Sequence, residues 1–210
     1  MLKYISYQQI FHQGLITKIL QNITICCIFK QTNNEAIYYY NLASKLETMN
    51  EEYLLQLAEK YDSPLYVYDT AIIASQYKRI TDAFKSVHHI QLNYAVKALS
   101  NINILRYFNT LGAGLDTVSI QEVDLGIAAG VDPQKIIYTP NGVSLEEIEN
   151  VAKKGVQINI DNLSILELFG QKHPEIPVCI RINPHVMAGG NSKISVGHID
   201  SKFGISVHQV

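Results

Sequence analysis

The sequence has no surplus of charge of either sign and no long uninterrupted apolar run. Its net charge is −2, and 17% of its residues are charged, so it lacks the basic excess with which proteins neutralise a phosphate backbone. The apolar stretch at residues 19–29 is broken by Gln21 and Asn22 and is shorter than a helix that spans a bilayer. These absences predict that neither nucleic acid nor membrane is a partner, and they favour a small-molecule ligand.

Cysteine is also scarce. The three cysteines are Cys26, Cys27 and Cys179. Their number is odd, and their spacing fits neither a disulfide framework nor a metal site. This usage is typical of a reducing compartment, so we predict a cytoplasmic protein with no metal centre.

The first 48 residues differ from the rest of the chain. They are rich in Ile, Asn, Gln and Tyr without a clean period. Lys3 ahead of an apolar stretch leaves a signal peptide open, although no small-residue cleavage site follows cleanly. We predict that residues 1–48 are a poorly ordered or non-native extension, with Met49 as the natural start of a domain over residues 49–210.

From Tyr53 onward, short β-rich runs alternate with amphipathic helical runs. Strand onsets recur about every 20 to 25 residues, which is the length of one βα unit. Ser119 with Glu122 and Ser144 with Glu147 are typical of capping boxes at helix starts. Gly112, Gly130 and Gly155 lie where helices are expected to end. The predicted strands are 65–68, 90–96, 115–118, 136–139, 156–160 and 178–182, and the predicted helices are 102–111, 119–129, 145–154 and 163–172.

Successive βα units predict an α/β fold with parallel strands, either an open doubly wound sheet or a closed barrel. The open sheet would be expected to carry a glycine-rich turn after its first strand, whereas the turn here reads ALSNIN. A barrel of the TIM type needs eight strands, and only about five barrel strands can be counted from Ile90. We therefore predict a partial (β/α)8 barrel, cut off after about five barrel strands, with open sheet edges.

Lys97 ends an alternating stretch in which it shares one face with Gln91, Asn93 and Ala95. That position is the carboxyl end of a strand, where barrel enzymes build their active sites. A desolvated lysine there loses its proton more easily and forms a Schiff base with a carbonyl. The alternative is a lysine whose amine only reaches out to water from the strand end.

Arg181 is the second charged candidate, because it sits within the apolar run VCIRINP. A buried guanidinium needs an anionic or hydrogen-bonding partner. Asp116, at the mouth of an earlier predicted strand, could be that partner. The two residues could hold a cofactor or each other.

Other polar residues carry a weaker signal. Ser119 is expected to cap a helix and could also contact a ligand. His88 and His89 are expected at the surface, and His185 and His198 are too dispersed for a metal site. The pair of glycines at residues 189 and 190 could cradle phosphate, although a flexible loop is the simpler interpretation.

Taken together, the motifs resemble the fold-type III pyridoxal-phosphate decarboxylases, whose barrel is of the alanine-racemase type, and within them the diaminopimelate decarboxylases. The resemblance covers about residues 50 to 210. It rests on the ordered motifs SPLYVYD, YAVKALSN, GAGLDTVSIQEV, IIYTPNG, INIDN, RINP and SKFGIS.

The resemblance implies that Lys97 carries pyridoxal phosphate, that Asp116 and Arg181 lie near the cofactor, and that Ser119 lies beside the ring. It also implies conversion of meso-diaminopimelate to L-lysine and CO2 by a homodimeric carboxy-lyase. The family's ring-stacking histidine, phosphate loop, acid facing the pyridine nitrogen and C-terminal β-domain would follow Val210. We therefore predict that residues 1–210 alone bind the cofactor poorly and do not turn over. The alternatives are an ornithine, arginine or carboxynorspermidine decarboxylase, a non-catalytic pyridoxal-phosphate carrier, and a gene product without function.

Overall fold

The structure is a computed structural model that describes residues 25–29, 38–41, 51–186, 197 and 201–209. Its contacts divide the chain into two units. The first lies mainly within Ile10–Ile90 and the second mainly within Gln91–Val210. Each unit is described by itself.

The first unit holds a small antiparallel sheet and two helices. Leu57 is buried among Tyr53, Tyr61, Leu65 and Val67, which gives this unit an apolar cluster of its own. The sheet has the strand order β2-β1-β3, with β1 paired antiparallel to both neighbours. The elements are β1 (Ile25–Phe29), β2 (Tyr38–Asn41), α1 (Glu51–Tyr61), β3 (Tyr66–Asp69) and α2 (Thr70–Ala83).

The predicted strand at 65–68 is thus confirmed with a shift of one residue. Most of residues 1–48 lie outside the described residues, so their assignment to an extension stays a prediction. The described strands β1 and β2 fall within that segment.

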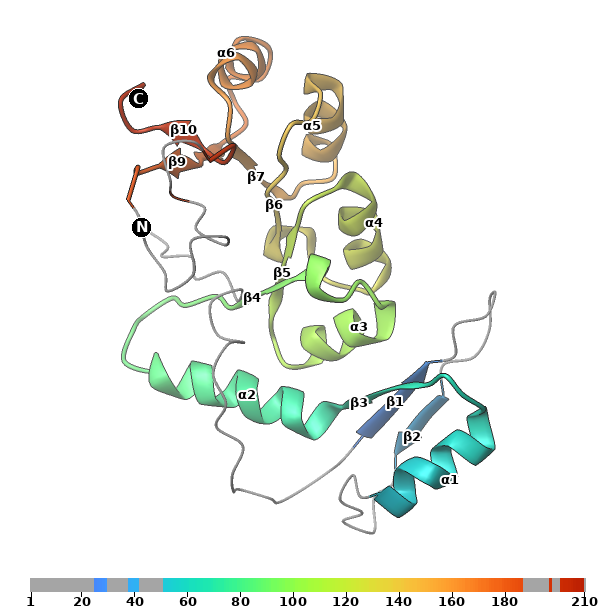
Figure 1. Cartoon of the computed structure of the whole chain (residues 1–210). Helices are drawn as coiled ribbons and strands as arrows, with labels where there is room; N and C mark the ends of the chain where they lie inside the picture. Colours follow the sequence, from blue (N-terminus) through green and yellow to red (C-terminus); the bar gives the residue numbers. More distant parts are fainter. Residues whose placement is uncertain (1–24, 30–37, 42–50, 187–196, 198–200, 210) are drawn as a thin grey trace. The chain divides into compact units, whose positions relative to one another are not determined.

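The second unit is built on a parallel sheet of five strands in the order β4-β5-β6-β7-β8. Helices α3 to α6 lie along one face of this sheet (Figure 1). The prediction of a partial (β/α)8 barrel with five parallel strands is confirmed. The strands are β4 (Asn93–Ala95), β5 (Gly114–Thr117), β6 (Ile136–Tyr138), β7 (Gln157–Ile160) and β8 (Val178–Ile180). The 3-10 turns are η2 (Val96–Ala98) and η3 (Pro133–Lys135), and the helices are α3 (Ile102–Thr110), α4 (Ile120–Ala128), α5 (Leu145–Ala152) and α6 (Leu163–Lys172).

The two faces of this sheet carry different sets of side chains. On the helix side, the strands contribute fully buried side chains that form one core with the helices: Leu115, Ile136, Tyr138, Ile158 and Ile160. Because side chains alternate along a strand, the residues between them point to the other face. Those residues include Asp116 on β5 and Asn159 on β7, and Thr139 continues the same face directly after β6. This second face, the concave face of the partial barrel, therefore carries several polar side chains beside the apolar Ala95 and Ile137.

Two of the predicted strands differ from the structure. The strand expected at 90–96 is β4 alone, and η2 follows it at once. The strand expected at 178–182 breaks at Arg181, where the chain changes its hydrogen-bonding partner. The Arg181 amide donates to the Ile160 carbonyl over 2.9 Å, whereas its carbonyl accepts from the Ile205 amide over 2.8 Å. The chain beyond it, β9 (Ile182–Asn183), pairs in parallel with β10 (Ile205–Ser206).

The predicted helix ends are confirmed. Gly112, Gly130 and Gly155 adopt φ values of 89°, 87° and 74°, a conformation that glycine reaches without strain. The amide of Gly130 donates to the Ile127 carbonyl over 2.9 Å and so closes the last turn of α4.

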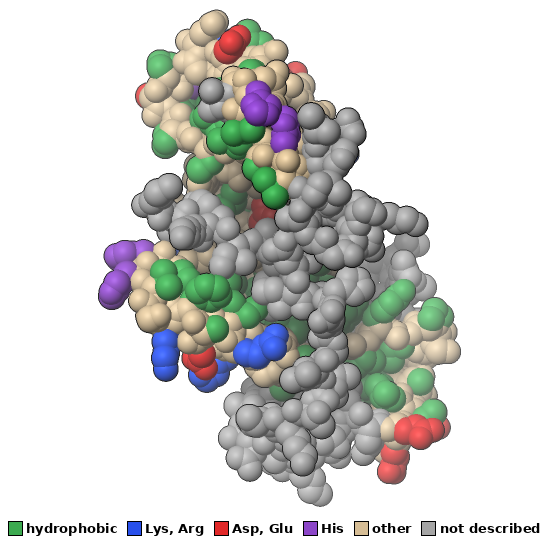
Figure 2. Space-filling model, turned by 60° about the vertical axis from the view of Figure 1, so that its left-hand side comes forward, with side chains coloured by type: hydrophobic (Ala, Val, Ile, Leu, Met, Phe, Trp, Pro, Cys, Tyr) green, Lys and Arg blue, Asp and Glu red, His purple; other side chains and the backbone are tan. Residues whose placement is uncertain are grey.

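Within the described part of the chain, no helix combines the length and the apolar character needed to cross a bilayer. On the face shown in Figure 2, the described basic side chains form small groups and no extended stripe. The expectation that nucleic acid is not a partner stays a prediction.

Candidate active site

Lys97 lies in the 3-10 turn η2, directly after β4 at the carboxyl end of the parallel sheet. Its side chain is exposed, so the expected desolvation of this lysine is not observed. The cause is the early end of β4, which places Lys97 beyond the buried part of the strand. Among the described residues, its amine makes no hydrogen bond or ion pair, and it is therefore accessible to an aldehyde.

Asp116 is the third residue of β5 and pairs in register with Ala95 on β4. Its carboxyl is half-buried. Burial raises the pKa of Asp116, while the hydrogen bond from Thr139 and the positive charges of Lys97 and Arg181 act in the opposite direction. The structure thus brings Lys97, Asp116 and Arg181 within electrostatic reach of one another.

A chain of hydrogen bonds crosses the concave face of the sheet behind Asp116. Thr139 Oγ1 donates to Asp116 Oδ1 over 2.8 Å. Asn159 Nδ2 donates to Thr139 Oγ1 over 2.9 Å. Three adjacent segments, β5, the end of β6 and β7, therefore contribute one polar side chain each to a continuous network.

Arg181 is half-buried, and its guanidinium carbon lies 4.5 Å from the centre of the Phe203 ring. This stacking holds the planar group in place. Arg181 and Asp116 do not form an ion pair within 4 Å among the described residues. Ile180 and Ile182 are 43% and 46% exposed, so the expected apolar surroundings of Arg181 are not observed. β8 is the last strand of the five-stranded sheet, and no described strand pairs with its other edge.

Ser119 is the N-cap residue of α4. Its Oγ accepts from the Glu122 amide over 3.2 Å, and Glu122 Oε2 accepts from the Val118 amide over 2.8 Å. The capping interpretation is confirmed. Capping uses a lone pair of the hydroxyl oxygen and leaves its proton available to a ligand.

His88 and His89 are exposed, as expected. No cluster of three potential metal ligands occurs among the described residues, and the absence of a metal site stays a prediction. His198 and the glycines at 189 and 190 lie outside the described residues.

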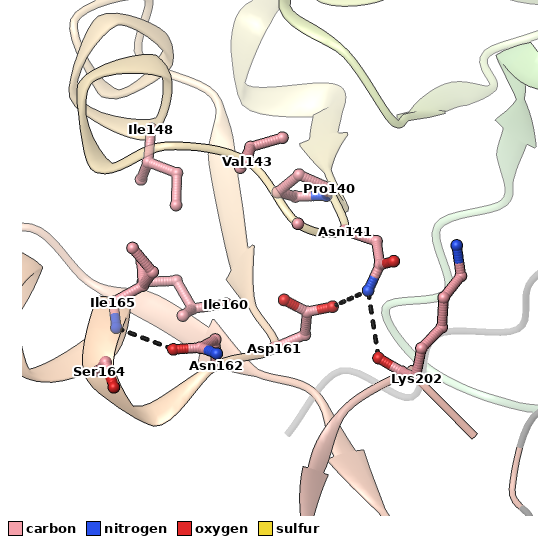
Figure 3. A pocket seen from close by; sticks show the side chains of 11 residues that line it. Pro140, Asn141, Val143, Ile148, Ile160, Asp161, Asn162, Ser164, Ile165 and Lys202 are labelled. Atoms are coloured by element: carbon pink, nitrogen blue, oxygen red, sulfur yellow. Dashed lines mark hydrogen bonds between the residues drawn. The ribbon is translucent and has the colours of Figure 1, made fainter. Parts of the chain in front are cut away.

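A pocket of about 500 Å³ opens beside the carboxyl ends of β6 and β7 (Figure 3). Asn141 Nδ2 donates there to Asp161 Oδ2 over 2.6 Å and to the Lys202 carbonyl over 3.3 Å. Lys97, Asp116, Ser119 and Arg181 do not line this pocket. The pocket and the predicted site are therefore distinct, and the charged groups on the concave face give the stronger chemical indication.

The sequence-based prediction of site residues missed Thr139 and Asn159. A usable signal was present for Asn159, because it alternates with Ile158 and Ile160 in the quoted motif INIDN and must face away from them. Thr139 lies one residue beyond the end of β6, and its partner depends on the register of β5 against β6.

Comparison with known families matches residues 70–210 to the pyridoxal-binding domain of the pyridoxal-dependent decarboxylases. The chain belongs to this family. Within the family, the matched domain is the one that binds the pyridoxal cofactor.

Relatives in the pyridoxal-dependent decarboxylase family are named diaminopimelate decarboxylase. The protein from Methanothermobacter thermautotrophicus is 37% identical over 153 residues, which cover 72% of this chain and 36% of the relative. The protein from Pseudomonas aeruginosa is 35% identical over 161 residues, covering 74% of this chain and 39% of the relative. The chain thus spans less than two fifths of the length of these curated relatives.

Solved structures of the family have the same fold as the chain. The diaminopimelate decarboxylase of M. jannaschii, in complex with L-lysine, is 29% identical, with a TM-score of 0.63 over 74% of this chain and 38% of that structure. The enzyme from Helicobacter pylori, also with L-lysine, is 30% identical, with a TM-score of 0.56 over 65% of this chain and 36% of that structure. The expected family, fold and cofactor class are confirmed.

Proposed function

We propose that this chain is part of a decarboxylase that converts meso-diaminopimelate to L-lysine and CO2, and that Lys97 holds its pyridoxal phosphate. The observation that carries the proposal is the exposed Lys97 amine at the carboxyl end of the sheet, within electrostatic reach of Asp116 and Arg181. The similarity to diaminopimelate decarboxylases at 35–37% identity supports the substrate. The whole enzyme would be a cytoplasmic homodimer.

The donor set on the concave face fits an anionic aldehyde. A primary amine can bond to the aldehyde carbon, while the guanidinium of Arg181 and the hydroxyl of Ser119 can donate to anionic or polar atoms of the same ligand. Bound pyridoxal phosphate would supply an electron sink for the pair of electrons left when CO2 departs.

Each residue has a separate task in this proposal. Lys97 would hold the cofactor through its amine. Asp116 places a carboxylate within electrostatic reach of that amine and helps to orient the ligand bound there. Arg181, fixed by Phe203 and by backbone hydrogen bonds on both sides, orients the ligand. Ser119 supports it from the start of α4.

Borohydride reduction followed by peptide mass mapping tests the attachment. The complete enzyme is incubated with pyridoxal phosphate, reduced and digested, and the reduced pyridoxyl adduct is expected on the peptide that contains Lys97. Lys97→Ala should abolish the adduct, and Lys202→Ala, which removes an exposed lysine from the nearby pocket, should retain it. An adduct on another lysine refutes the assignment of Lys97.

The substrate is tested on the complete enzyme by measuring CO2 release from meso-diaminopimelate, ornithine and arginine at equal concentrations. The proposal expects release from meso-diaminopimelate only. Release from ornithine or arginine instead would assign the chain to another branch of the family.

A further inference from the structure

The polar network behind Asp116 is unusual for a barrel interior. Polar side chains at such positions cost free energy unless hydrogen bonds satisfy them. Thr139 and Asn159 are both partly buried, and their polar groups form one chain that is directed at Asp116. This arrangement indicates a role that simple packing does not require.

The direction of the chain follows from the donors available. The Asn159 Nδ2 group can only donate, so Thr139 Oγ1 accepts from it. The threonine hydroxyl has a single proton, and that proton is given to Asp116 Oδ1. Asp116 Oδ1 is therefore held as an acceptor, and the other carboxylate oxygen is left for the positive charges of Lys97 and Arg181.

The two supporting residues are themselves anchored by the sheet. The Thr139 amide donates to the Thr117 carbonyl over 2.7 Å. Asn159 lies in β7 and pairs in register with Cys179 of β8. Thr139, one residue beyond β6, is thus held by its backbone bond to β5, and Asn159 is held by its place in β7. Strand register therefore sets the geometry around the Asp116 carboxylate.

We propose that Thr139 and Asn159 are positioning residues, which fix one oxygen of the Asp116 carboxylate so that the other faces the amine of Lys97. This inference rests on the proposed function, in which the amine of Lys97 binds the cofactor. A carboxylate that is held in one orientation keeps its charge directed at that amine. The hydrogen bonds themselves can be tested without the cofactor.

The first experiment measures the pKa of Asp116 by carboxyl carbon NMR in the absence of cofactor. The hydrogen bond from Thr139 favours the ionised carboxylate, so Thr139→Val should raise the pKa of Asp116 further, by about one unit. Thr139→Ser keeps the hydroxyl and should restore the original value. Thr110→Val, which removes the hydroxyl of an exposed threonine in α3, is the matched control and should leave the value unchanged.

Asn159→Ala supplies a second test that keeps every direct contact of Asp116. It should raise the pKa of Asp116 in the same direction by a smaller amount, because the network strengthens each of its bonds. If Asn159→Ala and Thr139→Val both leave the pKa unchanged, the positioning role is overturned. If Thr139→Ser behaves like Thr139→Val, the effect comes from packing and the proposal is equally overturned.

Adduct formation by borohydride reduction separates this inference from the proposed function. Thr139→Val should change the rate at which Lys97 captures pyridoxal phosphate several-fold, because the Asp116 carboxylate is no longer held in one orientation, and Thr139→Ser should restore the rate. If Lys97 forms no adduct in the unchanged complete enzyme, the proposed function fails while the NMR result still stands. If the adduct forms at the same rate in every variant, the positioning role fails and the assignment of Lys97 survives.

Discussion

The hydroxyl of Tyr138 donates to Oε1 of Glu147 over 2.7 Å, and this bond joins the end of β6 to the first turn of α5. Tyr138 is fully buried. Burial, followed by the hydrogen bond and the negative charge of Glu147, raises the pKa of the Tyr138 hydroxyl well above its ordinary value. The Tyr138 hydroxyl therefore keeps its proton and remains a donor. Its hydrogen bond to Glu147 satisfies the polar end of a side chain that otherwise lies in the apolar core.

We expect Tyr138→Phe to lower the free energy of unfolding by about 1 to 2 kcal/mol, because Glu147 loses its donor in a partly buried position. Urea unfolding followed by circular dichroism measures the change. Tyr66→Phe is the control, since Tyr66 is 59% exposed. Loss of the Tyr66 hydroxyl should change the free energy of unfolding by less than about 0.5 kcal/mol. Equal effects of the two variants would show that the Tyr138 bond contributes nothing.

The raised pKa of Asp116 predicts a pH dependence of stability. A carboxyl whose folded-state pKa is raised binds its proton more tightly in the folded state. The tighter binding of this proton stabilises the folded state fully below the unfolded-state pKa of Asp116. The stabilisation is lost as the pH rises through the raised folded-state pKa. Asp116→Asn removes this titration, so the variant should gain stability relative to the unchanged protein as the pH rises.

Urea unfolding at a series of pH values measures this difference. The total gain should be about 1.4 kcal/mol for each unit by which the pKa is raised. Glu146→Gln, which removes an exposed carboxylate from the first turn of α5, is the control. A dependence for Asp116→Asn that is no larger than that of the control would contradict a raised pKa.

Sequence alone predicted the five parallel strands well, because apolar alternation and capping residues are local signals. The cap at Ser119 and the end of α4 at Gly130 needed only their neighbours in the chain. The break at Arg181 did not follow from the local pattern. It arises because β8 pairs with β7 whereas β9, directly after Arg181, pairs with β10. A partner more than twenty residues away cannot be identified from periodicity.

In the candidate site, too, some features follow from local sequence and others depend on distant parts of the chain. Lys97, Asp116 and Arg181 could be chosen individually, because each is a charged residue in or beside an apolar strand. Their mutual reach and the support from Thr139 and Asn159 depend on the registers of β4 through β7. The exposure of Lys97 depends on where β4 ends, which strand propensity does not determine to within one residue.

Ser119 allows its capping role to be separated from its proposed ligand role. Ser119→Ala and Ser144→Ala each remove an N-cap bond of 3.2 Å, so each should lower the free energy of unfolding by about 1 kcal/mol. Only Ser119→Ala should also weaken cofactor binding, measured by titration with pyridoxal phosphate. Equal cofactor binding in the two variants would restrict Ser119 to capping.

Gly114 lies where β4, β5 and the turn before β6 come close together. It pairs in register with Asn93, and a Cβ atom at this position would collide with Oδ1 of Asn93 and with the backbone carbonyl oxygen of Lys135. The backbone oxygen cannot move without disturbing the start of β6. We therefore expect Gly114→Ala to lower the free energy of unfolding by about 1 to 3 kcal/mol.

The matched substitution is Gly170→Ala, because Gly170 lies within α6 and a Cβ atom there meets nothing within 4 Å. Alanine in a helix interior is favoured over glycine by roughly 0.5 to 1 kcal/mol, so this variant should be more stable than the unchanged protein. Chemical unfolding of both variants gives opposite signs if the approach of β4, β5 and the turn before β6 is as tight as described. A neutral or stabilising Gly114→Ala would mean that β4 and β5 can separate at Asn93, and the register that places Asp116 opposite Ala95 would then lose its support.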